Sequence, residues 1–261
     1  MIKKLVLKFI FISLIIFIYP NSVNALEINP DKREDPVKSE LLNSSYETFS
    51  TGKWYIPALD TSFTSNSGQG VTIAILDTGV TKTSYLSCHN FVSEYDAFND
   101  VWGPGSAEDI SYHGTLVAQT IADCNNGIAK NINIMPVRVF TDIYASYGLD
   151  TYTDDLAIAM GIVWAVDNNA DIINMSLGGD CYKTWEEGCR GSEGIIAGVN
   201  VTGLLDAAIK YAYDQGVLVV AASGNSALGW VSHPANNPYA WAVGAVNENF
   251  NKANFSNFGS A

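Results

Sequence analysis

Three side chains in this sequence have the types and surroundings that acid–base chemistry and the stabilisation of an oxyanion require. Asp77 directly follows the apolar run 71–76, and a carboxylate at the end of a buried strand is costly unless another group pairs with it. His113 precedes a second apolar stretch, and a histidine that a buried aspartate orients is the arrangement of a general base. Asn225 follows small residues and can point its amide at a developing oxyanion.

Each of these residues also has a plainer structural interpretation. Asp77 could cap a turn, His113 could be structural at a helix start, and Asn225 could form a turn. Asp77-Thr78-Gly79 is also the signature tripeptide of aspartic proteases, which need two such carboxylates sharing one proton. The sequence has a single copy of this tripeptide, which argues against that interpretation.

A further segment combines a strand with glycines. Residues 173–177 run into Gly178-Gly179, and a strand of this kind can place its backbone beside an extended peptide. The alternative is an ordinary strand followed by a turn.

Elements that are apolar on both faces must position these side chains. Short runs rich in β-branched residues predict parallel strands over residues 71–76, 132–139, 171–175, 217–222 and 241–246. Helical spacing predicts helices between them at 154–169 and 204–215, and a buried helix that starts at His113. The alternation predicts an α/β fold with a doubly wound, mostly parallel sheet and helices on both faces, whose site lies at the carboxyl ends of the strands.

The helix patterns also predict which residues are buried and where each helix starts or stops. Thr153 is the expected N-cap of the first helix, and Gly216 is the expected stop after the second. The predicted apolar stripes are Leu156, Ala159, Met160 and Val163 on the first helix, and Leu205, Ala208, Ile209 and Ala212 on the second.

Composition and charge narrow the function classes. The chain has 261 residues, 48% of them hydrophobic, which suffices for one domain with a full core and excludes bulk disorder. Lys and Arg number 14 against 27 Asp and Glu, a net charge of -13. Because an acidic chain repels phosphate backbones, nucleic acid is not an expected partner.

The N-terminus has the pattern of an export signal. Lys3, Lys4 and Lys8 precede the apolar run 9–19, and Val23-Asn24-Ala25 is a small-residue cleavage site. The run is shorter than the ~20 residues of a membrane-spanning helix, although a retained anchor is the alternative. We expect a signal peptide over 1–25, a linker or remnant over 26–50 and one domain over 51–261. The mature chain is then secreted or extracytoplasmic, with no membrane association.

Export favours disulfides among the four cysteines. Of three possible pairings we favour Cys181–Cys189, which closes a compact loop, and therefore Cys88–Cys124. Zinc binding with His89 is the alternative, and the lack of a Cys-x-x-Cys pair argues against it.

The order of the motifs resembles the subtilisin-like serine proteases (subtilases, peptidase family S8). Asp-Thr-Gly after a strand, His-Gly-Thr opening a helix, Asn-Met-Ser-Leu-Gly-Gly and Ala-Ser-Gly-Asn follow in that order, and the resemblance runs from about Trp54 to Ala261. It implies that Asp77 holds the imidazole, His113 is the general base and Asn225 contributes to the oxyanion hole. It also implies the segments that contact a polypeptide substrate: Ser176-Leu177-Gly178 along its backbone, and Ala222-Ser223-Gly224 in the pocket before the cleaved bond.

The resemblance is incomplete at one point. The family's nucleophile stands in Gly-Thr-Ser, and this tripeptide does not occur in the 261 residues. We therefore expect a domain that is incomplete at its C-terminus, lacks its nucleophile and is inactive alone. The alternatives are a catalytically dead, peptide-binding pseudoprotease, or a surface or interaction protein on a degraded fold. The chemistry needs no cofactor, structural calcium is left open, and we expect a monomer.

Overall fold

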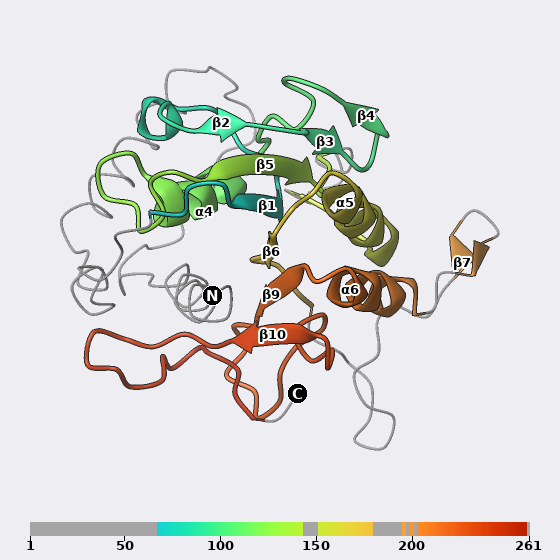
Figure 1. Cartoon of the computed structure of the whole chain (residues 1–261). Coiled ribbons are helices and arrows are strands. Elements are labelled where there is room, and N and C mark those ends of the chain that lie inside the picture. Colours follow the sequence, from blue (N-terminus) through green and yellow to red (C-terminus); the bar gives the residue numbers. More distant parts are fainter. Residues whose placement is uncertain (1–66, 143–150, 180–194, 197–198, 201–202, 260–261) are drawn as a thin grey trace, which may run out of the picture.

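The computed structural model describes residues 67–142, 151–179, 195–196, 199–200 and 203–259 (Figure 1). The predicted signal peptide, the 26–50 segment, and Cys181 with Cys189 lie outside the described residues.

A mostly parallel sheet forms the centre of the fold. Its strand order is β10-β9-β6-β1-β5-β3-β4, and β2 also pairs with β5. The core strands are β1 (Thr72–Asp77), β5 (Asn133–Arg138), β6 (Ile172–Met175), β9 (Leu218–Ala222) and β10 (Ala240–Val243). All neighbours among these five pair in parallel, which confirms the predicted fold class.

The strands at the far edge were not predicted. They are β2 (Asn90–Phe91), β3 (Tyr95–Asp96) and β4 (Val101–Trp102), and β4 is antiparallel to β3. Each has two residues, which is too short to show a period of two in the sequence. Two further short strands, β7 (Ile195–Ile196) and β8 (Val199–Asn200), pair with each other.

Helices cover both faces of the sheet. Figure 1 shows α5 (Asp155–Asp167) and α6 (Leu204–Asp214) together on one side and α4 (His113–Ala122) on the other. Alternate residues of β1 divide accordingly: Ala74 and Leu76 belong to the core under α5 and α6, and Ile73 and Ile75 to the core under α4. A strand buried on both faces explains the unbroken apolar run before Asp77.

The buried face of α5 differs from the prediction. Val163 is exposed, Leu156 and Met160 are half-buried, and of the predicted stripe Ala159 alone is buried. The face that packs on the sheet instead contains Gly161, where an added Cβ would lie 2.7 Å from Val139 Cγ1. The helix is apolar all round, so periodicity could not identify the side that touches the sheet.

The start of α5 also differs by one residue. Its N-cap is Asp154, whose side chain accepts a hydrogen bond from the Ala157 N–H. Thr153, the predicted cap, instead donates from Oγ1 to the Val139 carbonyl. Both residues are good N-caps by type, and the tertiary contact with the end of β5 decides between them.

The prediction for α6 is confirmed. Its buried residues are Leu205, Ala208, Ile209 and Ala212. Gly216 follows the C-cap Gln215 and has φ +80°, the left-handed conformation that ends many helices.

A disulfide joins Cys88 to Cys124, with the two Cα atoms 5.9 Å apart. It ties the chain after the short 3₁₀ helix η3 (Ser84–Leu86) to the end of α4.

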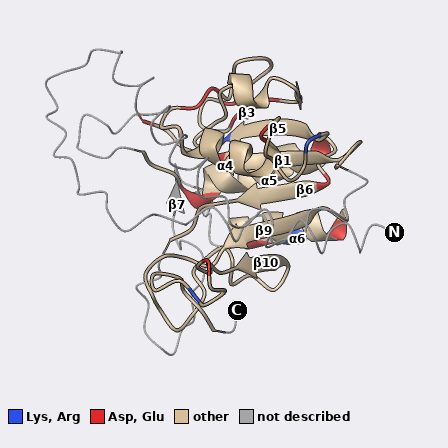
Figure 2. Ribbon diagram, turned by 90° about the vertical axis from the view of Figure 1, so that its left-hand side faces the viewer, with Lys and Arg blue, Asp and Glu red and all other residues tan. Residues whose placement is uncertain are grey.

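Figure 2 shows more of the described ribbon coloured for Asp and Glu than for Lys and Arg, in keeping with the negative net charge of the chain. Within the described residues, no helix has both the length and the hydropathy of a membrane span.

Candidate active site

Asp77 is the last residue of β1, and its side chain is completely buried. Its Oδ1 accepts hydrogen bonds from the Thr78 N–H and from His113 Nδ1, each at 2.7 Å. Its Oδ2 is buried and finds no hydrogen-bond partner among the described residues. A buried carboxylate with one oxygen unpartnered is costly, and a positive charge on His113 would reduce that cost.

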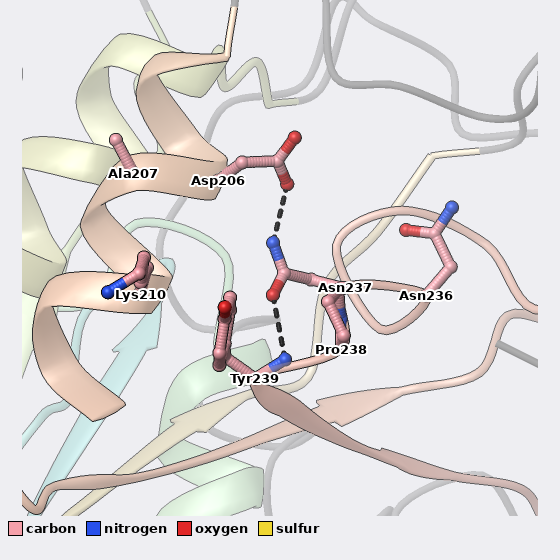
Figure 3. Close-up of a pocket in the computed structure, with 7 residues that line it drawn as sticks. All are labelled: Asp206, Ala207, Lys210, Asn236, Asn237, Pro238 and Tyr239. Atoms are coloured by element: carbon pink, nitrogen blue, oxygen red, sulfur yellow. Dashed lines mark hydrogen bonds between the residues drawn. The ribbon is translucent and has the colours of Figure 1, made fainter. Parts of the chain in front are cut away.

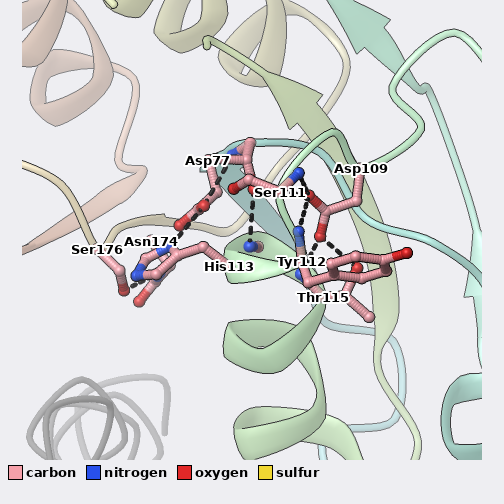
Figure 4. Close-up of polar contacts among 10 residues, drawn as sticks. Asp77, Asp109, Ser111, Tyr112, His113, Thr115, Asn174 and Ser176 are labelled. Carbon is pink, nitrogen blue, oxygen red and sulfur yellow. Dashed lines mark hydrogen bonds and ion pairs between the residues drawn. The ribbon is translucent and has the colours of Figure 1, made fainter. Parts of the chain in front are cut away.

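His113 is the first residue of α4 and connects this buried carboxylate to the surface (Figure 4). Its side chain is 40% exposed, whereas that of Asp77 is 0% exposed. Since an ionised carboxylate only accepts hydrogen bonds, the contact assigns the proton to Nδ1, and proton exchange with a substrate falls to Nε2. Burial lowers the pKa of His113, but the Asp77 hydrogen bond and the charges of Asp77 and Asp109 outweigh burial and raise the pKa above 6.5.

The glycine after each of these residues allows the two segments to approach each other. A Cβ on Gly114 would lie 2.1 Å from the carbonyl oxygen of Gly79 and 3.0 Å from Asp77 Cβ. Gly79 has φ +108°, and a Cβ there would lie 2.5 Å from the Glu108 carbonyl oxygen. Gly114 therefore allows the Asp-Thr-Gly and His-Gly-Thr segments to pack together, and Gly79 allows the first of them to pack on residues 107–108.

Asp109 holds the start of α4, and the sequence analysis did not identify it. Its Oδ1 accepts from Thr78 Oγ1 at 2.7 Å and from the N–H groups of Ser111 and Tyr112 at 3.0 and 2.9 Å. Its Oδ2 accepts from the N–H and the hydroxyl of Thr115. The N-cap Tyr112 has a left-handed backbone and no side-chain cap of its own, so Asp109 supplies the acceptor. The signal that could have identified Asp109 in the sequence is its acidic side chain four residues before His113, just ahead of the helix start.

Strand register brings the predicted substrate segments to the same edge. Leu76 pairs with Met175, and Met175 pairs with Ala221. Ser176 and Ala222, the next residues along, therefore lie at the carboxyl ends of β6 and β9, in line with Asp77. Ser176 is buried and its Oγ accepts from Asn174 Nδ2 at 2.9 Å.

Leu177 and Gly178 continue from this edge toward a neighbouring segment. Leu177 is buried, and a Cβ on Gly178 would lie 3.0 Å from the His233 carbonyl oxygen. The next residue, Gly179, donates its N–H to that same carbonyl at 3.0 Å. Gly178 therefore permits a close approach to residue 233 of the same chain, and the predicted pairing of this segment with a peptide stays a prediction.

Asn225 follows β9 on a loop at this edge. Ser223 is buried, Gly224 has φ +107° and Asn225 is exposed. The structure thus joins Asp77 and His113 by direct contact and places Asn225 beyond β6, at the end of the next strand but one from β1.

The cysteine–histidine cluster has a structural use. Ligand atoms of Cys88, His89 and Cys124 lie within 4.8 Å of one another, but both sulfurs are in the disulfide. His89 is buried, and its two ring nitrogens face the carbonyl oxygens of Ile132 and Ala122. Thiolates, the form of cysteine that binds zinc, are not available in this arrangement.

A cavity of about 400 Å³ lies elsewhere, between α6 and residues 236–239 (Figure 3). Its polar side chains bond mainly to neighbours: Asn237 Nδ2 donates to Asp206 Oδ1 at 2.6 Å, and Lys210 pairs with Asp214 at 2.6 Å. None of the residues singled out in the sequence lines it, so we do not assign it to the site.

The site thus comprises a buried carboxylate, an imidazole bonded to it and an amide-bearing loop at the same sheet edge. The profile of the Subtilase family (peptidase S8) matches residues 68–261. The chain is 32% identical over 249 residues to an alkaline protease of Alkalihalobacillus alcalophilus, covering 92% of this chain and 56% of the relative. It is 35% identical over 195 residues to subtilisin Savinase of Lederbergia lenta, covering 74% and 62%.

Solved structures of subtilisin-like proteases are similar to this chain as well. A cold-adapted subtilisin-like serine proteinase superposes with a TM-score of 0.59 at 29% identity, covering 74% of this chain and 61% of the other. The prenylagaramide maturation protease PagA gives a TM-score of 0.58 at 27% identity, covering 78% and 64%. The chain belongs to the subtilase family of serine proteases. It spans 56–62% of the length of the curated relatives cited above.

Proposed function

We propose that this chain contributes the acid–base pair and the oxyanion loop of a serine endopeptidase that hydrolyses peptide bonds through an acyl-enzyme. The observation that carries the proposal is the 2.7 Å contact between Asp77 Oδ1 and His113 Nδ1. Family membership and the raised pKa of His113 support it, because a general base must be oriented and able to hold a proton during the reaction.

In the first half of the reaction, a serine Oγ attacks the substrate carbonyl carbon as its proton passes to His113 Nε2. The new C–O bond pushes an electron pair onto the carbonyl oxygen, and the amide of Asn225 donates a hydrogen bond to it. The tetrahedral intermediate then collapses, the C–N bond breaks, and His113 gives its proton to the departing amine. Buried Asp77 stabilises the imidazolium that exists between the two proton transfers.

In the second half, water takes the place of the serine hydroxyl. His113 removes a proton from water as it attacks the acyl carbon, and it returns that proton to the serine when the acid is released. Because Gly-Thr-Ser does not occur in the 261 residues, we assign the nucleophile to none of the serines in this chain.

Substrate contacts follow from the positions at the sheet edge. We assign backbone pairing with an extended polypeptide to Ser176-Leu177-Gly178, and the pocket for the residue before the cleaved bond to Ala222-Ser223-Gly224. The enzyme acts without a cofactor and as a monomer, and it is exported after removal of residues 1–25. N-terminal sequencing of the exported protein is expected to begin at Leu26.

The test uses the protein translated from its reading frame to the stop codon, wild type and His113→Ala. We expect the wild type to cleave casein and to be labelled by a fluorophosphonate, which reacts with activated serines. His113→Ala is expected to lose about 10⁶-fold in turnover, the size known from a subtilisin, and to lose labelling. A wild type that is not labelled but retains peptides on a column would overturn the proposal in favour of a binding module.

A further inference from the structure

The loop that carries Asn225 is fastened by one residue from a distant part of the sequence, Asn257. Gly224, which precedes Asn225, accepts a hydrogen bond on its carbonyl from the Asn257 N–H at 2.9 Å. Ser226, which follows Asn225, donates its N–H to Asn257 Oδ1 at 2.9 Å. Both neighbours of Asn225 are therefore bonded to the same residue.

The side chain of Asn257 makes further contacts along residues 223–232. Its Oδ1 also accepts from the Leu228 N–H at 3.0 Å, and its Nδ2 donates to Ser232 Oγ at 2.8 Å. Ser223 Oγ in turn donates to the Asn257 carbonyl at 3.1 Å. Every polar group of Asn257, on the backbone and on the side chain, thus bonds to the structure around Asn225.

Burial makes these contacts strong and specific. Asn257 and Ser232 are each 1% exposed, whereas Asn225 itself is exposed. A buried amide that lost these partners would carry a desolvation cost, so the loop is held in the one arrangement that satisfies them. Gly224 fits the same account, because a Cβ there would lie 2.4 Å from both Asn257 Nδ2 and Ser232 Oγ.

We propose that Asn257 is the positioning residue of the oxyanion hole, which fixes the backbone on both sides of Asn225 so that its amide points at the developing oxyanion. This inference rests on the proposed function, because it gives Asn225 its catalytic role. A preorganised donor stabilises the oxyanion without reorganising during the reaction, whereas a donor on an unrestrained loop must first be ordered.

The first experiment does not depend on activity. Amide hydrogen exchange is measured by NMR in the wild type, Asn257→Ala and Asn257→Asp, with Asn247→Ala as the matched control. Asn247 Oδ1 also accepts from two backbone N–H groups, those of Asn249 and Asn251, but in an exposed turn that involves none of residues 223–228 in these bonds.

We expect Asn257→Ala to speed exchange at Ser226 and Leu228 by about 100-fold while the β9 amides keep their protection. Asn257→Asp keeps both acceptor positions and is expected to retain most of the protection. The Asn247→Ala control is expected to change its own turn only. Unchanged exchange at Ser226 and Leu228 in Asn257→Ala would overturn the proposal.

The second experiment asks whether Asn257 acts through Asn225. In the protein translated to its stop codon, Asn225→Ala is expected to lower kcat by about 10²–10³-fold, a range established on a subtilisin. We expect Asn257→Ala to lower kcat by about 10-fold or more with little change in KM, but by less than about 2-fold in the Asn225→Ala background. Asn257→Asp is expected to restore most of kcat.

The outcomes separate the two proposals. Equal losses from Asn257→Ala with and without Asn225 would show that Asn257 does not act through Asn225, and would overturn this inference while the proposed function stands. A wild type that cleaves nothing, in spite of the expected exchange pattern, would overturn the proposed function and reduce Asn257 to a purely structural residue.

Discussion

The Asp77–His113 pair and the loop carrying Asn225 lie at the same sheet edge, but different contacts hold them. The pair sits between a strand end and a helix start, and its supporting residues are Thr78 and Gly114 from the two motifs and Asp109 from the segment just before the helix. The Asn225 loop has no regular secondary structure. It is held by hydrogen bonds to Asn257, which lies near the C-terminal end of the described residues.

The difference has a physical consequence. Around His113, Asp77 bonds to the ring, whereas Thr78 and Asp109 hold the start of the helix that carries it, so each substitution removes a different contact. Around Asn225, the Asn257 side chain alone bonds to Ser226, Leu228 and Ser232, so a single substitution removes these three contacts together. We therefore expect effects in the first region to range from large at Asp77 to small at Asp109, and a single substitution at Asn257 to release several contacts of the second region together.

The largest expected effect in the first region comes from Asp77→Asn. The variant removes the charge that stabilises the imidazolium and favours the wrong tautomer, and such a change costs about 10⁴-fold in turnover in serine proteases. Hydrolysis of a peptide substrate by the protein translated to its stop codon measures it. Asp123→Asn is the matched control, since Asp123 is also fully buried and accepts from the N–H groups of Asn125 and Asn126. Equal activity in both variants would contradict the assigned role of Asp77.

Gly114→Ala should break the fit between the two motifs. The added Cβ would overlap the Gly79 carbonyl oxygen, 2.1 Å away. Because this oxygen belongs to the backbone, it cannot move aside as the end of a flexible side chain could. Overpacking of this kind costs about 3 kcal/mol in the free energy of unfolding. Urea denaturation measures this cost, with Gly179→Ala as the control, because a Cβ on Gly179 would meet nothing within 4 Å. A Gly114→Ala variant as stable as the control would show that the two segments are less tightly apposed.

A smaller effect is expected from Asp109→Asn. The amide keeps one acceptor oxygen for the start of α4 but loses the other set of contacts and the charge, at a cost of about 1–2 kcal/mol in the free energy of unfolding. It should also lower the pKa of His113, because the charge of Asp109 helps to raise it. Glu108→Gln is the matched control, as Glu108 is an exposed neighbour bonded to Thr81 Oγ1. An effect of equal size in Glu108→Gln would show that Asp109 has no special position.

The sequence predicted the core strands from their apolar runs, and it predicted the buried face of a helix where the helix pattern is one-sided. The buried residues of α6 follow from its spacing, because polar residues mark the opposite face. Around α5 nearly every residue is apolar, so the pattern could not identify its buried face, and Gly161 against Val139 decided it. The two-residue strands β2, β3 and β4 are too short for any periodicity to indicate them.

The site likewise contains residues that the sequence predicted and residues that it did not. Asp77, His113 and Asn225 could be named from motifs, because each stands at a strand end or helix start with small residues beside it. Asp109 and Asn257 were not named, because Asp109 lies outside both motifs and the significance of Asn257 lies in hydrogen bonds to residues that the fold brings near. Asn257 in particular is one of several asparagines near the end of the sequence, and no local pattern sets it apart.

The titration of His113 tests the central claim most directly, namely that Asp77 and His113 form a coupled acid–base pair. NMR of the imidazole in wild type and Asp77→Asn measures it, and needs no nucleophile. We expect a pKa above 6.5 in the wild type and a lower pKa in Asp77→Asn, where burial still lowers it but the Asp77 charge is gone. The activity of the base should accordingly fall as pH drops through the raised pKa.

The same shift fixes the sign of the stability effect. Since folding raises the pKa of His113, its contribution to stability is fully present below the unfolded pKa and is lost as pH rises through the folded pKa. The account predicts that Asp77→Asn abolishes this pH-dependent contribution together with the raised pKa. An identical His113 titration in wild type and Asp77→Asn would contradict it.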